Sequence, residues 1–125
     1  MRLLLDTHIF LWLTAESPLL NSHARTLIAD ASLVYVSSVT IWEATIKTRI
    51  GKLTVDPDDL LLEIEKCGFQ ELPVLGRHAA GVARLPLLHT DPFDRLLVAQ
   101  AMTEPMRLLT ADAQLAAYSE LVTVI

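Results

Sequence analysis

The chain has 125 residues, which suits a single domain, residues 1–125, built around one hydrophobic core. Apolar residues make up 52% of the sequence and charged residues 20%, which excludes a disordered chain. The net charge of −5 argues against indiscriminate binding to nucleic acid through a basic surface, but two divalent cations held by four carboxylates would change it to −1. The single cysteine, Cys67, cannot form an intrachain disulfide, so we expect a cytoplasmic protein.

Five short apolar runs, separated by helix-length segments, predict a sheet of about five mainly parallel strands with helices on both faces. The runs are residues 3–5, 33–36, 69–74, 106–109 and 121–125. The apolar stretch 3–13 is interrupted by Asp6 and His8 and is too short to span a bilayer, so we interpret it as a buried strand followed by a helix. The expected fold is a three-layer α/β/α domain.

Start and stop signals frame three of the helices between these strands. Ser37 or Ser38 caps the first, and Gly51 lies just past its end. Asp56 and Asp91, each followed by proline, open the other two. These signals predict helices that end near residues 50, 68 and 102.

Two acidic residues follow strands of the predicted sheet. Asp6 comes directly after the first apolar run, and Asp112 comes three residues after the run that ends at Leu109. Ligands of open parallel sheets bind beyond the carboxyl ends of the strands, so both carboxylates lie where chemistry is expected. The alternative for each is a turn or a helix N-cap.

Glu43 lies on the apolar side of its predicted helix. The apolar stripe of this helix consists of Val39, Trp42, Ile46 and Ile50. Glu43 is four residues after the first member of the stripe and seven before the last, so we expect it to point toward the core. Two alternatives remain, a capping box with Thr40 and an i,i+4 ion pair with Lys47.

Asp94 is placed in the same way on a later helix. Leu97, Val98 and Ala101 follow it at offsets of three, four and seven residues. A carboxylate that faces a core needs a partner, because burial of an unpaired charge costs many kcal/mol. The alternative is a capping interaction with Asp91 across Pro92.

Four carboxylates at one sheet edge repel one another, and only protonation or a cation makes the arrangement stable. Oxygen ligands without clustered Cys or His favour Mg²⁺ or Mn²⁺. Such ions suit phosphodiester hydrolysis, in which a pair about 3.5–4 Å apart activates a water and stabilises the leaving oxygen. No nucleophilic side chain lies in a recognisable catalytic motif. His23 and His78 are interpreted as ordinary helix residues.

Four stretches, in family order and over nearly the whole chain, resemble the motifs of PIN domains of the VapC toxin family. They are Leu3-Leu4-Leu5-Asp6-Thr7-His8 with Leu11-Trp12; Ser37-Ser38-Val39-Thr40-Ile41-Trp42-Glu43-Ala44 with Lys47 and Gly51-Lys52-Leu53; His89-Thr90-Asp91-Pro92-Phe93-Asp94-Arg95-Leu96-Leu97-Val98-Ala99-Gln100-Ala101; and Leu109-Thr110-Ala111-Asp112.

This resemblance implies a Mg²⁺- or Mn²⁺-dependent endoribonuclease, the toxin of a type II toxin–antitoxin pair, which cuts RNA as a homodimer and is inhibited by an antitoxin whose tail enters the active site. The acids of the family map onto Asp6, Glu43, Asp94 and Asp112. Asp91 is assigned a capping role with possible orientation of the site, and Thr7 and Thr110 are expected to hydrogen-bond the carboxylates or bound waters.

Positive charges for the RNA backbone are expected from Lys47, Arg49 and Arg95, with Lys52 nearby. Lys47 and Arg95 are expected either near the phosphate or as residues that orient the carboxylates; the alternative is that they are solvated surface charges. Exposed aliphatic residues expected in the first two helices are candidates for the dimer surface: Leu19, Leu20 and Ile28. Two other functions stay open, a non-catalytic PIN-like binding scaffold and an aspartate-dependent phosphatase on a similar sheet.

Overall fold

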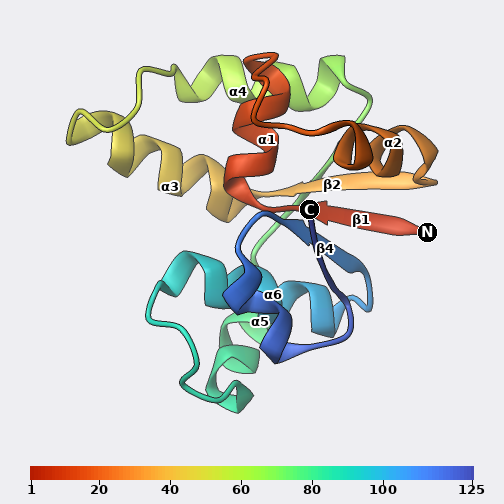
Figure 1. Ribbon diagram of the computed structural model, residues 1–125. Coiled ribbons are helices and arrows are strands. Elements are labelled where there is room, and N and C mark those ends of the chain that lie inside the picture. Colours follow the sequence, from red (N-terminus) through yellow and green to blue (C-terminus); the bar gives the residue numbers. More distant parts are fainter.

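The computed structural model describes all residues, 1–125, and contains one sheet of five parallel strands (Figure 1). The strands are β1 (Arg2–Leu5), β2 (Leu33–Ser37), β3 (Gln70–Leu72), β4 (Arg107–Thr110) and β5 (Val122–Val124). Their order across the sheet is β3-β2-β1-β4-β5, and every neighbouring pair is parallel. All five predicted strands are confirmed, although β3 and β5 are shorter than the apolar runs that indicated them.

Six α-helices and two short 3₁₀ helices connect the strands. They are α1 (Thr7–Thr14), α2 (Ser22–Asp30), α3 (Ser38–Arg49), α4 (Pro57–Lys66), α5 (Gly76–Gly81), η1 (Val82–Arg84), α6 (Pro92–Thr103) and η2 (Ala113–Tyr118). No start or stop signal in the sequence had indicated the bounds of α5 or η1, which together cover only nine residues, although His78 was expected on a helix. No helix combines the length and the apolar character needed to cross a membrane.

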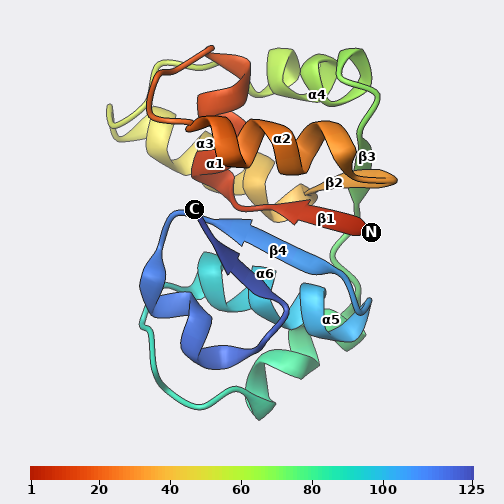
Figure 2. The same ribbon diagram turned by 45° about the vertical axis from the view of Figure 1, so that its right-hand side comes forward.

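The helices cover both faces of the sheet, which confirms the three-layer α/β/α prediction. Leu3 and Leu5 of β1 face the layer that contains α1, α2 and α4, whereas Leu4 faces the layer that contains α5 and α6. Figures 1 and 2 show these two layers on opposite sides of the strands. Each leucine contributes to one of two separate hydrophobic clusters, because successive side chains of a strand point to opposite faces.

The predicted capping residues begin their helices. The side chains of Ser37, Asp56 and Asp91 accept hydrogen bonds from backbone N–H groups in the first turns of α3, α4 and α6. Gly51 follows α3 with a φ of +81°, a left-handed conformation that glycine adopts without strain. The loop chemistry of these three helices was therefore readable from the sequence.

The connections reverse direction at the centre of the sheet. From β1 the chain moves outward to β2 and β3, and then crosses back to β4 on the other side of β1. The crevice at such a reversal, beyond the carboxyl ends of the strands, is the usual ligand site of an open α/β sheet. Leu5 pairs with Leu109 across this point, so the residues that follow β1 and β4 lie side by side.

Two predictions about exposure are wrong. Trp42 and Ile50, assigned to the core-facing stripe of α3, are each 59% exposed, and Ile46 is also exposed. The buried face of α3 instead consists of Val39, Thr40, Glu43 and Ala44. Leu20, assigned to a dimer surface, is 3% exposed and packs in the core between α1 and α2, whereas its neighbour Leu19 is exposed. A short loop that turns between two packed helices buries one of two adjacent leucines.

Candidate active site

Asp6 is the residue between β1 and α1, and it is 3% exposed. Its Oδ1 accepts a hydrogen bond from the backbone N–H of His8 (3.1 Å), so it caps α1. Its Oδ2 accepts a hydrogen bond from the hydroxyl of Thr110 at the end of β4. The N-cap alternative is thus correct for Asp6, and it coexists with a position at the centre of the sheet edge.

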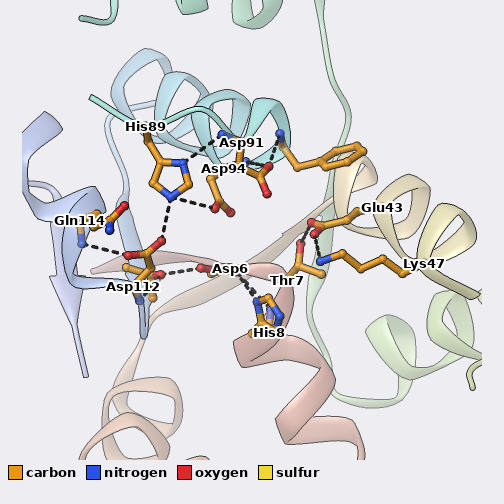
Figure 3. Close-up of polar contacts among 12 residues, drawn as sticks. Asp6, Thr7, His8, Glu43, Lys47, His89, Asp91, Asp94, Asp112 and Gln114 are labelled. Carbon is orange, nitrogen blue, oxygen red and sulfur yellow. Dashed lines mark hydrogen bonds and ion pairs between the residues drawn. The ribbon is translucent and has the colours of Figure 1, made fainter. Parts of the chain in front are cut away.

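Asp94 lies in the first turn of α6, on the same helix face as the buried residues Leu97, Val98 and Ala101. Its backbone N–H and that of Phe93 donate to Oδ1 of Asp91, over 3.2 and 2.8 Å. The capping role expected for Asp91 is therefore confirmed. The Asp94 side chain itself makes no hydrogen bond, and its carboxylate points back toward the end of β1 (Figure 3).

Asp112 follows β4 and caps η2, because its Oδ1 accepts a hydrogen bond from the backbone N–H of Gln114 (2.9 Å). Its own N–H donates to the hydroxyl oxygen of Thr110 (3.0 Å), and that hydroxyl donates to Asp6. Thr110 thus connects two of the predicted acids, as expected for a residue that orients the carboxylates.

These three acids share one pocket. A cavity of about 280 Å³ is lined by Asp6, His8, Trp12, Asp94, Ala111 and Asp112. It opens at the reversal between β1 and β4, where the topology predicts a ligand site. A larger groove of about 580 Å³ lies alongside, between α1 and α4, and shares His8 and Trp12 with the acidic pocket. The groove contains none of the predicted acids of the site, so the smaller cavity carries the chemistry.

Glu43 lies beside this pocket and does not line it. It is 2% exposed, and both of its carboxylate oxygens have donors: the Thr7 hydroxyl on Oε1 (2.7 Å) and Lys47 Nζ on Oε2 (2.6 Å). Thr7 donates its only hydroxyl hydrogen to Glu43. The hydroxyl of Thr40, 3.0 Å from that of Thr7, must therefore donate to the Thr7 oxygen. The ion-pair alternative for Glu43 is correct, and the capping-box alternative is wrong because Ser37 caps α3.

Burial and the electrostatic repulsion of neighbouring carboxylates change the pKa values in the site. Burial, together with the charges of Asp6, Asp91 and Glu43, raises the pKa of Asp94 to about 7, although His89 lowers it in part. Burial also raises the pKa of Asp6; the hydrogen bonds from Thr110 and His8 oppose this rise, and the charge of Glu43 adds to it. The protein by itself therefore leaves negative charge in this pocket without a compensating cation.

The ammonium group of Lys47 contacts Glu43 and none of the other predicted acids. Burial alone would lower its pKa, but the hydrogen bond and charge of Glu43, with the charges of Asp91 and Asp94, raise it above the ordinary 10.5. Lys47 is thus held in the charged form, directed at a carboxylate. Lys47 therefore contacts one of the four predicted acids, Glu43, and its role toward RNA or the other acids stays a prediction.

The other expected basic residues do not join the site. The guanidinium group of Arg95 donates to the backbone carbonyls of Val82 and Leu85, on the side of α6 that faces η1. The side chains of Arg49 and Lys52, at the end of α3 and just after it, are exposed and make no hydrogen bond or ion pair. They remain free to contact a polyanion, whereas Arg95 is engaged within the fold.

His89 belongs to the site, although the sequence pattern did not single it out. Its Nε2 lies 3.0 Å from Oδ2 of Asp112 and 3.7 Å from Oδ2 of Asp94 (Figure 3). His89 lies on the loop before α6, two residues ahead of Asp91, and no periodicity marks a loop residue. The one available signal was its place at the start of a motif that carries two acids. His23 is exposed on α2, and His78 is buried in α5, so both are helix residues as predicted.

The donor set fits a hard divalent cation. Asp6, Asp94 and Asp112 offer carboxylate oxygens to one cavity, and no cysteine is near it. Burial raises the pKa of both Asp6 and Asp94, so a cation bound between them would favour the ionised form of each acid. Oxygen-only ligation favours Mg²⁺ or Mn²⁺ over Zn²⁺.

Comparison with solved structures identifies several proteins with a similar fold. The structure is similar to VapBC2 from Rickettsia felis, crystallised with a DNA fragment of its promoter, with a TM-score of 0.71 and 14% identity over 100% of this chain and 98% of that chain. A toxin–antitoxin complex from Klebsiella pneumoniae is similar with a TM-score of 0.68 and 17% identity, covering 97% and 95% of the two chains. FitAcB from Neisseria gonorrhoeae matches with a TM-score of 0.62 and 20% identity, over 90% and 89%.

The sequence itself identifies the family. No curated protein matches the chain, but the model of the PIN domain matches residues 3–121. This range begins in β1 and ends just before β5, so it includes the sheet reversal and all four predicted acids. The chain therefore belongs to the PIN-domain family.

Proposed function

We propose that this protein is a Mg²⁺- or Mn²⁺-dependent endoribonuclease, the toxin of a type II toxin–antitoxin pair. The observation that carries the proposal is the common pocket of Asp6, Asp94 and Asp112 at the sheet reversal, where burial raises the pKa of Asp6 and of Asp94 and the charge of Asp6 raises that of Asp94 further. A scaffold that only binds partners has no need for such an energetically costly cluster.

The residues of the pocket suit phosphodiester hydrolysis. Asp6, Asp94 and Asp112 would hold the cation, which supplies positive charge to the phosphate and lowers the pKa of the attacking water. Thr110 keeps Asp6 oriented, and the N–H of Gln114 keeps Asp112 oriented. Glu43 contributes its negative charge from one side, because both of its oxygens are already held by Thr7 and Lys47.

An antitoxin is the expected partner, and the groove next to the pocket supports this. Apolar side chains of α1, α4 and the preceding loop line it, among them Leu11, Trp12, Val55 and Leu60. Asp56, Asp59 and Glu63 add negative charge to the lining. These surroundings suit an amphipathic segment with basic residues, which could continue past His8 and Trp12 into the acidic pocket.

Self-association is the remaining part of the proposal. With Leu20 buried, the better surface is the exposed stripe of α3, Trp42, Ile46 and Ile50, extended by the ring of Phe93 that packs edge-on against Trp42. A homodimer through this stripe would remove these apolar side chains from water. The single cysteine supports a reducing cytoplasm as the site of action.

The test is RNA cleavage by the purified chain. We expect short single-stranded RNAs to be cut with Mg²⁺ or Mn²⁺, and cleavage to stop when EDTA is added. Asp94→Asn removes a charge from the pocket and keeps the shape of the side chain. Loss of a residue that only hydrogen-bonds a metal ligand can lower activity by about 100-fold. Loss of a ligand itself should lower the cleavage rate by more than this.

His23→Gln is the matched control, because His23 is exposed on α2 outside the pocket. This variant should cut RNA at the wild-type rate and rule out a contaminating nuclease when purified in parallel with Asp94→Asn. RNA binding by a folded wild-type protein, with no cleavage at any concentration of Mg²⁺ or Mn²⁺, would contradict the nuclease and support the scaffold.

A further inference from the structure

His89 lies between two of the proposed ligand carboxylates. It is on the loop between η1 and α6, with a side chain 14% exposed, and its Nε2 is 3.0 Å from Asp112 and 3.7 Å from Asp94. By proximity alone, His89, Asp94 and Asp112 could form a three-residue metal site with one nitrogen and two oxygen ligands. The hydrogen bond at the other ring nitrogen argues against this arrangement.

Nδ1 of His89 accepts a hydrogen bond from the backbone N–H of Asp91 (3.0 Å). A backbone N–H can only donate, so Nδ1 must carry a lone pair and no proton. The neutral ring then has its single proton on Nε2, the nitrogen that faces Asp112. A nitrogen that carries a proton has no lone pair for a metal, but it is a good hydrogen-bond donor.

We propose that His89 is a positioning residue, which holds Asp112 through a fixed Nε2–H donor and is not itself a metal ligand. The proposal rests on the proposed metal site and deepens it by dividing that site into ligands and supports. His89 would then do for Asp112 what Thr110 does for Asp6.

Asp112 needs this support because it is the least enclosed of the three acids, with 35% of its side chain exposed. The N–H of Gln114 holds Oδ1 and His89 holds Oδ2, so both oxygens are oriented and each retains a lone pair for a cation. The loop that carries His89 is itself fixed near its start, where Arg95 donates to the carbonyl of Leu85. Arg95, which was expected at the RNA, therefore holds the start of the loop that carries His89.

The first test is the tautomer of His89 in the metal-free full-length protein, measured by ¹⁵N NMR of the histidine rings. We expect an unprotonated Nδ1 and a protonated Nε2 at His89, with the signal assigned by its loss in His89→Gln. His78 is an internal reference, since its Nδ1 also accepts a backbone N–H, that of Leu75 (3.0 Å). A proton on Nδ1 of His89 would overturn the proposal.

The second test separates the two ring nitrogens by substitution. In His89→Gln the amide nitrogen can occupy the place of Nε2 and donate to Asp112, whereas in His89→Asn the amide oxygen can replace Nδ1 as the acceptor for Asp91. We expect Mn²⁺ affinity, measured by calorimetry, to stay near wild type in the Gln variant and to fall about 10–100-fold in the Asn variant. The reverse order would show that His89 only shapes the loop, and would overturn the proposal.

Pulsed EPR of bound Mn²⁺ completes the design, because a directly coordinated imidazole nitrogen produces a nitrogen coupling. We expect no such coupling in the wild-type protein, and its presence would make His89 a ligand and the proposal wrong. These readouts do not depend on catalysis. Mn²⁺ binding with the predicted order of variants but without RNA cleavage would defeat the proposed function and leave the role of His89 standing.

Discussion

The hydroxyl of Thr110, the last residue of β4, donates a hydrogen bond to Asp6, the first residue after β1. The register that pairs Leu5 with Leu109 makes this contact possible, because it brings the next residue of each strand side by side. The same hydroxyl oxygen accepts the N–H of Asp112. A single threonine at the sheet reversal therefore sets the positions of two carboxylates that are 106 residues apart.

Thr110→Val should weaken both the fold and the site. The substitution keeps the shape of the side chain but removes the donor to Asp6 and the acceptor for the N–H of Asp112. We expect the free energy of unfolding to fall by about 1–3 kcal/mol in urea titrations, as for other buried polar groups that lose a partner. Thr110→Ser retains the hydroxyl and should remain close to wild type; equal loss in both variants would contradict the hydrogen-bond explanation.

Metal-free protein should lose stability as the pH rises from about 4 to about 7, and Asp94 should cause part of this loss. Its pKa is about 7 in the folded state against an ordinary 3.8, so in this range the folded protein keeps a proton that the unfolded chain releases. Asp94→Asn removes this contribution, so in EDTA the variant should become progressively more stable relative to wild type up to pH 7.

Thermal unfolding of both proteins at several pH values measures this difference. Mg²⁺ or Mn²⁺ should reduce it, because a bound cation stabilises the ionised carboxylate of the wild type. A constant difference across the pH range would mean that Asp94 is not destabilised by its surroundings.

The ion pair between the buried Glu43 and the half-buried Lys47 should cost more stability when one partner is removed than when both charges are replaced. Lys47→Met leaves the carboxylate of Glu43 buried without its cationic partner, and we expect a loss of about 3 kcal/mol in the free energy of unfolding. Glu43→Gln together with Lys47→Met removes both charges and should recover most of that loss. Chemical denaturation of the two single variants and the double variant gives the coupling; additive effects would show that the ion pair contributes nothing.

Glu104, at the opposite end of α6 from Asp94, should affect stability and leave cleavage unchanged. The hydrogen bond from His78, helped by the charge of Arg77, keeps the pKa of Glu104 below its ordinary 4.5. Its contribution to stability is therefore present above pH 4.5 and is lost as the pH falls through its lower folded-state pKa. Glu104→Gln should be less stable than wild type at pH 7 and equal to it in acid, with RNA cleavage unaltered; reduced cleavage would connect this end of α6 to the site.

The pattern of apolar runs was sufficient to predict the layers of this fold, because a strand buried on both faces requires a continuous apolar run. Capping residues are equally local, since Ser37, Asp56 and Asp91 contact N–H groups only two residues away. The position of Asp6 followed from the same local logic. For these features the interacting atoms are neighbours in the chain.

Helix faces were predicted less well. Glu43 is buried as expected, but the apolar stripe that served as the argument for its burial is exposed. A helical stripe reports that one face is apolar, and that face can be a surface for another molecule as easily as a core. Which face of α3 meets the sheet depends on how α3 packs, and no sequence window contains that information.

Sequence by itself determined the fold class, the strand ends at which acids lie and the capping of the helices, because these depend on short-range periodicity and hydrogen bonds. Only the tertiary structure decided that His89 meets Asp112, that Arg95 turns toward Leu85 and that Leu20 is buried. These contacts depend on the sheet register and on helix packing, which bring together atoms from separate elements. Their energies arise only once the whole chain has folded.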